Sequence, residues 1–527
     1  MSKEREKELK PLSFSTTIRN PDRIIDFLNC ILEYEGKILT NQLIYEILKN
    51  ILRKKVYKPQ YINSNIELKN IYNSEEIFTE EQLDEIIINS EQRHKEKDFD
   101  KGWPSRFDTW YKLPKELGFI YYRMGEQIII SSTGHMLINA MNNDNPDNQK
   151  KQDIFLNAMM KYQTNNPFRK NKMSNSPLIL LLNTIKLLKE DNKENNAGIF
   201  RNEIPLLICW KNDDYHSLYQ LIKRIRQQYK YNYGDEIIYE ICLSLLGANK
   251  EKNAKRFKIT QITNEAVDDF IRKMRITGVI SLRGNGRFID FNTFKIDTIN
   301  YILQNYSQYK TFTDEKEFFK YMGNIDSNIL RSYKIDVNKI NNIKISELNK
   351  WAQEYTKEYI INELKILSKK QETKNNVLKF INKPTRLEFL TSIYLKQNFK
   401  TLKIYPNYSV DDEGLPTFTA TGNMADIECF DIDSNQLIEV TLISSRNQSI
   451  VEVPAIKRHL EESIKKFNNN KTFSILVAPI IHEDTKLLVG YIKYQHKLTI
   501  IPLTITEFIS KLQQCQNISE ILNVIFS

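Results

Sequence analysis

The last third of the chain contains a series of short runs rich in β-branched and aromatic residues. These runs read TLKIYPNYSV, MADIECFDI, QLIEVTLIS, TFSILVAPII and KLTIIPLT, and turn-like or helical sequence separates them. Short strands interrupted by helical stretches are typical of an α/β domain. The pattern therefore predicts a separate α/β domain over residues 373–527.

The residues before this domain have a different pattern, which is mainly helical with short hairpins. A chain of 527 residues is expected to hold about three or four domains. The polar stretch 142–152 predicts a boundary between a unit over residues 1–150 and a second unit over 151–310. The charged helical stretch 311–372 is typical of a linker. We thus predict a multidomain protein whose N-terminal region is mainly α-helical.

The composition excludes several classes of protein. Apolar residues make up 41% of the chain and charged residues 27%, with 15 glycines and 15 prolines, so a disordered or collagen-like chain is excluded. The longest apolar run, at residues 178–182, is far shorter than the roughly 18 residues that cross a membrane. The N-terminus MSKEREKELK does not look like a signal peptide, and the five scattered cysteines include no C-x-x-C pair. These features, with the heavy use of Ile, Asn and Lys, predict a cytoplasmic protein of a prokaryote.

Two segments of the N-terminal region have the order of a winged-helix unit, in which a helix is followed by a hairpin. The first covers residues 105–131, and in the second the helical run 265–277 precedes VISL, the tip RGNGR and FIDF. Between Glu251 and Arg287 there are nine basic and four acidic residues, whereas the net charge of the whole chain is +10. A helix with a basic-tipped hairpin indicates contact with DNA phosphates, and a solvated helix beside an ordinary hairpin is the alternative.

The candidate DNA-binding residues are basic side chains of this second segment and of the first helix. Arg19 and Arg23 lie near the start of the first helix, where they could contact DNA; the alternative is that Asn20 only caps this helix. The predicted set is Arg19, Arg23, Arg272, Lys273, Arg275, Arg283 and Arg287.

Two carboxylates interrupt otherwise apolar runs of the C-terminal domain. Asp426 lies in MADIECFDI and Glu439 in QLIEVTLIS, with the turn-forming residues Asp433, Ser434 and Asn435 between them. The two runs are therefore predicted to be adjacent antiparallel strands, which brings both acids to one edge. A buried carboxylate is costly without a partner, and Mg²⁺ prefers oxygen ligands. The pattern indicates a magnesium site, while acids with a purely structural role are the alternative.

Two further acids flank this pair. Glu388 lies in the helical run RLEFLTSIYL, and Glu452 opens the helix VPAIKRHLEESIKKF. The order of helix, strand, strand with Asp, strand with Glu, helix and strand resembles the common core of the PD-(D/E)xK nucleases, in which two acids hold Mg²⁺ and a third polar residue orients water. Thr441 stands where that motif has lysine, so either Glu452 or Lys457 supplies the missing function, or the site is degenerate. His459 is a candidate phosphate contact, with a surface or capping role as the alternative.

Longer motifs at both ends of the chain resemble one family. The opening PLSFSTTIRNPDRIIDFL with GKILTNQ after it, the stretch DEGLPTFTATGNMADIECFD with IEVT, and the helix VPAIKRHLE resemble the AlwI-like type IIS restriction endonucleases, the family of the BstNBI-, PleI- and MlyI-type enzymes. The resemblance implies an N-terminal recognition region with winged-helix-like subdomains, a helical linker and a C-terminal α/β nuclease domain of the PD-(D/E)xK type. It also implies Mg²⁺-dependent cleavage at a fixed distance outside a short asymmetric DNA site. E-V-T in place of E-x-K is similar to this family as well, so Thr441 does not argue against activity.

The resemblance also implies roles for particular residues and partners. The implied catalytic residues are Glu388, Asp426, Glu439 and Glu452, and the implied metal ligands are Asp426, Glu439 and Val440. The expected partners are double-stranded DNA, a transient dimer or second subunit for double-strand cleavage, and a companion DNA methyltransferase. An enzyme that nicks one strand would share these motifs. A winged-helix regulator without activity and a repair or mobile-element nuclease with the same core are the alternatives.

Overall fold

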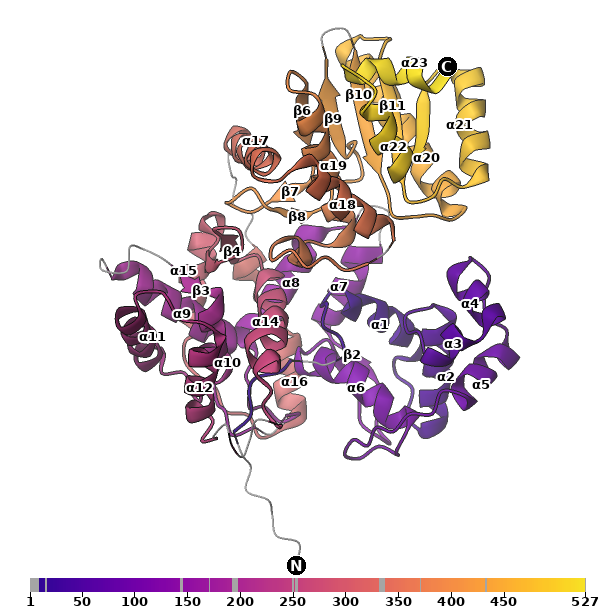
Figure 1. Cartoon of the computed structure of the whole chain (residues 1–527). Helices are drawn as coiled ribbons and strands as arrows, with labels where there is room; N and C mark the ends of the chain where they lie inside the picture. The colour runs from indigo at the N-terminus through magenta and orange to yellow at the C-terminus, as the bar shows by residue number, and fades with distance from the viewer. Residues whose placement is uncertain are drawn as a thin grey trace, which may run out of the picture. The chain divides into compact units, whose positions relative to one another are not determined.

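The computed structural model describes residues 9–14, 17–142, 146–169, 171–191, 198–248, 251, 255–330, 337–369, 371–431 and 434–526. The chain divides into two compact units, one from residues 1–143 and 147–332 and the other from residues 144–146 and 333–527 (Figure 1). The protein is therefore multidomain and mostly helical, with a mixed sheet in the second unit. None of the described helices is both long and apolar enough to cross a membrane.

The first part of unit 1 consists of helices and one small hairpin. The helices are α1 (Arg23–Ile31), α2 (Asn41–Arg53), α3 (Gln60–Ser64), α4 (Ile66–Asn73), α5 (Glu80–Ile88), α6 (Trp103–Glu116) and α7 (Ser132–Asn142), and the strands are β1 (Ile120–Tyr121) and β2 (Ile129–Ile130). Helix α2 begins at Thr40, whose hydroxyl accepts a hydrogen bond from the Leu43 N–H at 3.1 Å and so satisfies one free donor of the first turn. Helix α6 and the antiparallel pair β1–β2 match the helix and hairpin predicted at 105–131.

The second part of unit 1 contains the other predicted helix and hairpin. Its elements are α8 (Asn148–Lys161), α9 (Pro177–Glu190), β3 (Ile199–Phe200), α10 (Ile204–Ile208), α11 (Tyr215–Tyr229), α12 (Asp235–Leu245), α14 (Ala266–Arg275), β4 (Ile280–Arg283), β5 (Phe288–Phe291), α15 (Ile296–Tyr306) and α16 (Glu315–Gly323). Val267, Phe270 and Met274 lie on the buried face of α14 at helical spacing. Gly278 ends this segment with φ +73°, and a Cβ there would lie 2.2 Å from the Gln152 side chain. Strand β3 adds to the β4–β5 hairpin, giving the order β3-β5-β4.

Unit 2 is built around a five-stranded mixed sheet. Its strands are β6 (Lys403–Pro406), β9 (Ile427–Phe430), β10 (Asn435–Val440), β11 (Phe473–Ala478) and β12 (Ile500–Thr504), in the order β12-β11-β10-β9-β6. β6, β9 and β10 pair in antiparallel fashion, and β10, β11 and β12 pair in parallel. Each β-rich run of the sequence therefore forms a strand of one sheet. Asp433 of the predicted turn lies outside the described residues, and Asn435 already begins β10.

Helices complete the unit. They are α17 (Val337–Glu354), α18 (Lys357–Ser368), α19 (Lys383–Asn398), α20 (Val453–Phe467), α21 (Glu483–His496), α22 (Ile505–Leu512) and α23 (Ile521–Phe526), and a small hairpin pairs β7 (Ser409–Val410) with β8 (Pro416–Phe418). Of these helices, α17, α19, α20, α21 and α22 contact strands of the sheet. Leu437 and Leu476 of the sheet join one core with Val453, Ile456 and Leu460 of α20. Each such side chain stabilises the fold by about 1.5–3 kcal/mol. Because side chains alternate along a strand, the residue two positions after Leu437 also faces α20.

Helices α17 and α18 lie within the predicted linker 311–372 and pack against α19, so they belong to unit 2. Residues 331–336 and 370 of that stretch, and residues 143–145 of the boundary stretch 142–152, lie outside the described residues. The division into units at 1–150, 151–310, 311–372 and 373–527 stays a prediction.

Candidate active site

Asp426 and Glu439 meet at the edge between β9 and β10. Asp426 directly precedes β9, Glu439 lies in β10, and the antiparallel register pairs their neighbours Ile427 and Ile438. The Asp426 N–H donates to Glu439 Oε2 at 3.4 Å, and the Val440 N–H donates to Asp426 Oδ2 at 2.7 Å. The two acids that the sequence singled out are thus in contact through the backbone of both strands.

Glu388 reaches the same region from α19. Its side chain is buried, and Oε2 accepts a hydrogen bond from the Ala420 N–H at 3.1 Å. Burial raises the pKa of this carboxyl to about 8, and the charge of Glu439 adds to the rise, while the Ala420 N–H and the Lys344 ammonium oppose it. A carboxyl with such a pKa is close to the range in which a proton can be exchanged at neutral pH.

The carboxyl of Asp426 is affected in the same direction. Burial raises its pKa well above the ordinary value, and the negative charges of Glu388, Glu439 and Glu452 raise it further, against the Val440 N–H bond. The site thus gathers more negative charge than its hydrogen bonds neutralise. Carboxylates whose pKa values are raised in this way are typical of functional sites.

Glu452 ends a π-helical turn (Gln448–Glu452) that leads into α20. The Thr441 hydroxyl donates to Glu452 Oε1 at 2.9 Å, so the residue in the place of the motif lysine holds this acid. Burial raises the pKa of Glu452, Glu439 adds to the rise, and the Thr441 bond and His459 oppose it.

His459 and Lys457 project from α20 into different surroundings. His459 Nδ1 lies 2.9 Å from Glu439 Oε1, Nε2 lies 3.4 Å from the Gly422 carbonyl oxygen, and its side chain is only 9% exposed. Burial lowers the pKa of the imidazole, but the bond to Glu439 and its charge outweigh burial, so the pKa is raised. Lys457 Nζ instead pairs with Glu461 Oε1 one turn along the helix, at 2.9 Å. The structure thus places His459, and not Lys457, against the paired acids.

Lys344 of α17 is a residue that the sequence analysis missed. It is buried, its ammonium donates to the Pro406 carbonyl oxygen at 2.9 Å, and it lies 5.4 Å from the centre of the Tyr408 ring. Burial lowers its pKa to about 8, and the charge of Glu388 opposes that fall. The signal was available, since Lys344 shares a helical face with the buried Leu348 and Trp351.

The sequence predicts Mg²⁺ at this site, and the side chains present decide whether it fits. Among the described residues, no three His, Cys, Asp or Glu side chains are grouped as a metal site. Mg²⁺ needs less, because it binds through one or two carboxylates together with phosphate oxygens and water. Asp426 and Glu439 supply the two carboxylates, and Val440 could contribute only its backbone carbonyl oxygen. The residues present therefore fit Mg²⁺ bound together with a phosphate.

Three of the candidate DNA-binding residues, Arg19, Arg23 and Arg287, are exposed in unit 1. Arg19 pairs with Glu265 at 3.0 Å, both side chains being more than half exposed, and Arg23 donates to the Val56 carbonyl oxygen. Arg272 and Arg275 lie in the last turn of α14 and are half-buried.

The hairpin arginines differ from each other. Arg287 is exposed, with Nε bonded to the Gly284 carbonyl oxygen at 3.1 Å. Arg283 pairs with Asp290 at 3.1 Å and donates to the Phe291 carbonyl oxygen at 2.8 Å. Only Arg287 therefore combines exposure with a purely local bond.

Lys273 has an internal position instead of the expected phosphate contact. It is 1% exposed, and its ammonium donates to Asp269 at 2.7 Å and to the carbonyl oxygens of Ile18 and Arg19 at 3.3 and 2.8 Å. Those three bonds use every N–H of the ammonium. Lys273 thus holds the N-terminal segment against α14, and the prediction that it binds DNA is corrected.

The sequence of the chain matches a model of a known protein family. The family model described as AlwI restriction endonuclease matches residues 115–345 and 322–510, which together span most of the chain. The protein is therefore a restriction endonuclease, a nuclease that acts on DNA at specific sequences. It belongs to the AlwI restriction endonuclease family, as its motifs predicted, which favours this function over the regulatory and repair alternatives. The second match includes all four acids and His459, whereas the opening motif lies before the first.

Solved structures of restriction enzymes are also similar to the chain. The small subunit of the heterodimeric restriction endonuclease R.BspD6I is 23% identical over 32% of this chain and 87% of its own, with a TM-score of 0.27. Restriction endonuclease FokI is 11% identical over 98% of this chain and 96% of its own, with a TM-score of 0.26. FokI bound to DNA gives 10% identity, the same coverage and a TM-score of 0.23. A comparison with curated proteins found no match.

Proposed function

We propose that this restriction endonuclease is a Mg²⁺-dependent enzyme of the type IIS kind, which binds a short asymmetric site and cuts DNA at a fixed distance outside it. The observation that carries the proposal is the contact between Asp426 and Glu439 on neighbouring strands, with Glu388 and Glu452 beside them. A chain of a restriction endonuclease family that gathers four acids at one sheet edge has the ligands for phosphodiester hydrolysis.

Each residue of the candidate active site has a proposed role. Asp426 and Glu439 would hold Mg²⁺ with the carbonyl oxygen of Val440, and the bound ion would supply charge stabilisation at the scissile phosphate and an activated water. His459 keeps the Glu439 carboxylate in its orientation through the 2.9 Å contact. Glu452 takes the place of the motif lysine as the group that orients the water, because Thr441 fixes it.

Two alternatives for the missing lysine can be ranked by their contacts. Lys457 forms an ion pair with Glu461 at 2.9 Å, whereas the charges of Glu439 and His459 act on the carboxyl of Glu452. Glu452 is therefore favoured over Lys457 as the residue that replaces the motif lysine. Glu388, whose pKa is about 8 and which therefore carries a proton at neutral pH, is proposed as a proton donor that assists Glu452.

DNA recognition is proposed for unit 1, with winged-helix-like subdomains in its two parts. The hairpin β4–β5 carries the exposed Arg287 next to its tip, and the last turn of α14 has the half-buried Arg272 and Arg275. Phosphate contacts from such side chains would set the position of the enzyme on DNA, and base contacts would define the site.

One active site cuts one strand, so double-strand cleavage is proposed to need a transient dimer or a second subunit, and a chain acting alone would nick DNA. A companion methyltransferase is proposed to protect the host's own sites. Sequencing the ends of DNA digested by the purified chain reports the site, the offset and the strand together.

The test of the active site compares variants in a plasmid digest with Mg²⁺. Asp426→Ala and Glu439→Ala should lose cleavage by at least about a hundredfold while DNA binding in a gel shift with EDTA persists, because ligands of the ion are removed but phosphate contacts are not. Glu428→Ala, a change at a half-buried acid of β9, serves as the matched control and should keep cleavage. Near-normal cleavage by Glu439→Ala would contradict the assignment.

A further inference from the structure

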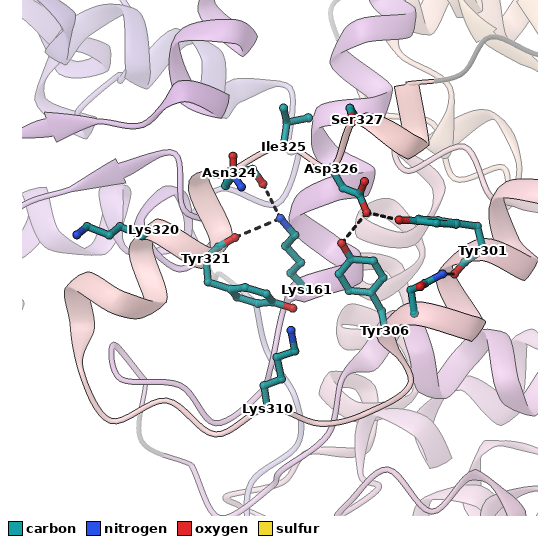
Figure 2. A pocket seen from close by; sticks show the side chains of 11 residues that line it. Lys161, Tyr301, Tyr306, Lys310, Lys320, Tyr321, Asn324, Ile325, Asp326 and Ser327 are labelled. Carbon is teal, nitrogen blue, oxygen red and sulfur yellow. Dashed lines mark hydrogen bonds between the residues drawn. The ribbon is translucent and has the colours of Figure 1, made fainter.

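Unit 1 contains a pocket of about 450 Å³ whose lining has more lysines than acids (Figure 2). It lies where the end of α8, the end of α15 and the C-terminal half of α16 come together. Three lysines and one aspartate line it, together with three tyrosines: Lys161, Lys310, Lys320, Asp326, Tyr301, Tyr306 and Tyr321. None of these residues was singled out by the sequence, because they are spread over 166 positions of the chain.

Lys161 brings a buried positive charge to this pocket. Lys161 is 6% exposed. Its ammonium donates to the Tyr321 carbonyl oxygen at 3.2 Å and to the Asn324 carbonyl oxygen just after α16. In the described part of the chain no carboxylate forms an ion pair with it, and two carbonyls engage only two of its three N–H donors. Burial lowers the pKa of Lys161 to about 8, the Lys310 charge adds to that fall, and Asp326 opposes it. Such a charge is costly unless an anion is supplied.

Lys310 adds a second cation at the opening of the same pocket. Its side chain is exposed, and its ammonium lies 4.9 Å from the centre of the Tyr321 ring, while that of Lys161 lies 5.3 Å from it. Figure 2 shows the Tyr321 ring between the two lysines, whereas Lys320 extends away from them. The two ammonium groups share a ring instead of a carboxylate.

Asp326, the one acid of the lining, does not neutralise these lysines. Its Oδ2 accepts hydrogen bonds from the Tyr301 and Tyr306 hydroxyls at 2.7 and 2.8 Å, and Oδ1 accepts from the Asn328 N–H at 2.9 Å. Those bonds stabilise the carboxylate where it stands, on the far side of the pocket from Lys310 in Figure 2. The space between therefore has an excess of positive charge that the described residues leave without an ion pair.

We propose that this pocket binds a phosphate group, with Lys310 and Lys161 as the cations that receive it. Lysine ammonium groups bind phosphate as point charges, and a phosphate would provide the counter-charge that Lys161 lacks. The chain is a DNA nuclease, so the favoured source is the backbone of duplex DNA, and free phosphate is the other source. The proposal rests on DNA binding by unit 1 but not on the active site of unit 2.

The experiment measures binding of a fluorescein-labelled 30-bp duplex by anisotropy, with the full chain in EDTA and NaCl from 50 to 200 mM. Lys310→Ala should weaken binding and lower the slope of log K against log salt by about one, so that the loss at 50 mM exceeds the loss at 200 mM by about fourfold. Lys316→Ala is the matched control, because Lys316 is exposed on α16 outside the pocket and pairs with Glu126 at 2.9 Å. Lys310→Arg should restore binding.

Two further measurements separate the outcomes. Lys161→Met keeps the length of the side chain and should weaken duplex binding as well, with circular dichroism as the check of folding. Titration calorimetry with inorganic phosphate tests the other source. If Lys310→Ala changes neither duplex nor phosphate binding, the pocket is not a phosphate site. If it changes phosphate binding alone, the DNA source is wrong. A wild-type chain that binds no duplex would contradict DNA binding itself.

Discussion

Replacing Glu388 by glutamine should stabilise the metal-free protein while it removes cleavage. Glu388 is 3% exposed, and one backbone N–H, that of Ala420, donates to its carboxyl. Its pKa lies at about 8 in the folded protein and at 4.5 in an ordinary glutamate, with burial as the largest cause. The folded chain therefore keeps a proton on this group that the unfolded chain has already lost at pH 5 to 8.

The size of the effect follows from linkage. Because the folded state binds more protons over this range, the free energy of unfolding falls as pH rises, by about 1.4 kcal/mol per pKa unit. At pH 8 the loss in the free energy of unfolding is about 4 kcal/mol, compared with a chain whose residue 388 never ionises. Glutamine never ionises and can still accept the Ala420 bond. A gain of that size in a unit of this length corresponds to a melting temperature about 10 °C higher.

The assay is thermal unfolding of the full chain in EDTA at pH 5, 6, 7 and 8. The melting transition of unit 2 should differ little between wild type and Glu388→Gln at pH 5 and increasingly toward pH 8. Glu358→Gln, the same change at an exposed position of α18, should show no such trend. If the Glu388→Gln curve runs parallel to the wild-type curve at all four pH values, Glu388 is ionised in the folded protein and the reasoning is refuted.

Four further outcomes are expected. Lys344→Met should raise the pKa of Glu388 further and so move the pH–rate profile of cleavage to higher pH. Lys344→Arg should stay closer to wild type. An unshifted profile for Lys344→Met would argue against an effect of Lys344 on Glu388 during cleavage. His459→Gln should lower cleavage about tenfold or more without loss of DNA binding. The stabilisation from the His459–Glu439 pair should be complete below pH 6.5 and disappear as pH rises through the raised pKa of the imidazole, which NMR titration measures. Arg287→Ala should lower the salt slope of DNA binding by about one.

The sheet and its paired acids were predictable because strand patterns are local. Alternating apolar residues and the turn between the two runs determine which strands are neighbours, and Asp426 and Glu439 interrupt those runs at matched places. The contact of His459 with Glu439 was not predictable, since it joins residues 20 positions apart on a helix and a strand and depends on how α20 packs on the sheet. The paired acids were therefore predictable from local patterns, whereas the side chains that contact them were not.

The basic residues show the other limit of sequence reasoning. A count of charges between residues 251 and 287 treats every lysine and arginine as exposed, but Lys273 is bonded to carbonyls 254 and 255 positions away. Lys161 is engaged in the same way by the end of α16. Contacts of this range depend on how helices pack, and neither periodicity nor spacing reveals them.

Thr441, which stands in the place of the motif lysine, holds Glu452 with its hydroxyl. A lysine at this position would place an ammonium group within reach of Glu452, whereas the threonine hydroxyl holds the same carboxyl with a neutral bond of 2.9 Å and leaves its pKa raised. Positive charge near the acids comes instead from two helices, from His459 of α20 beside Glu439 and from Lys344 of α17, whose charge acts on Glu388. Since α17 lies in the stretch that looked like a linker, that stretch contributes to the electrostatics of the active site as well as to the connection between the units.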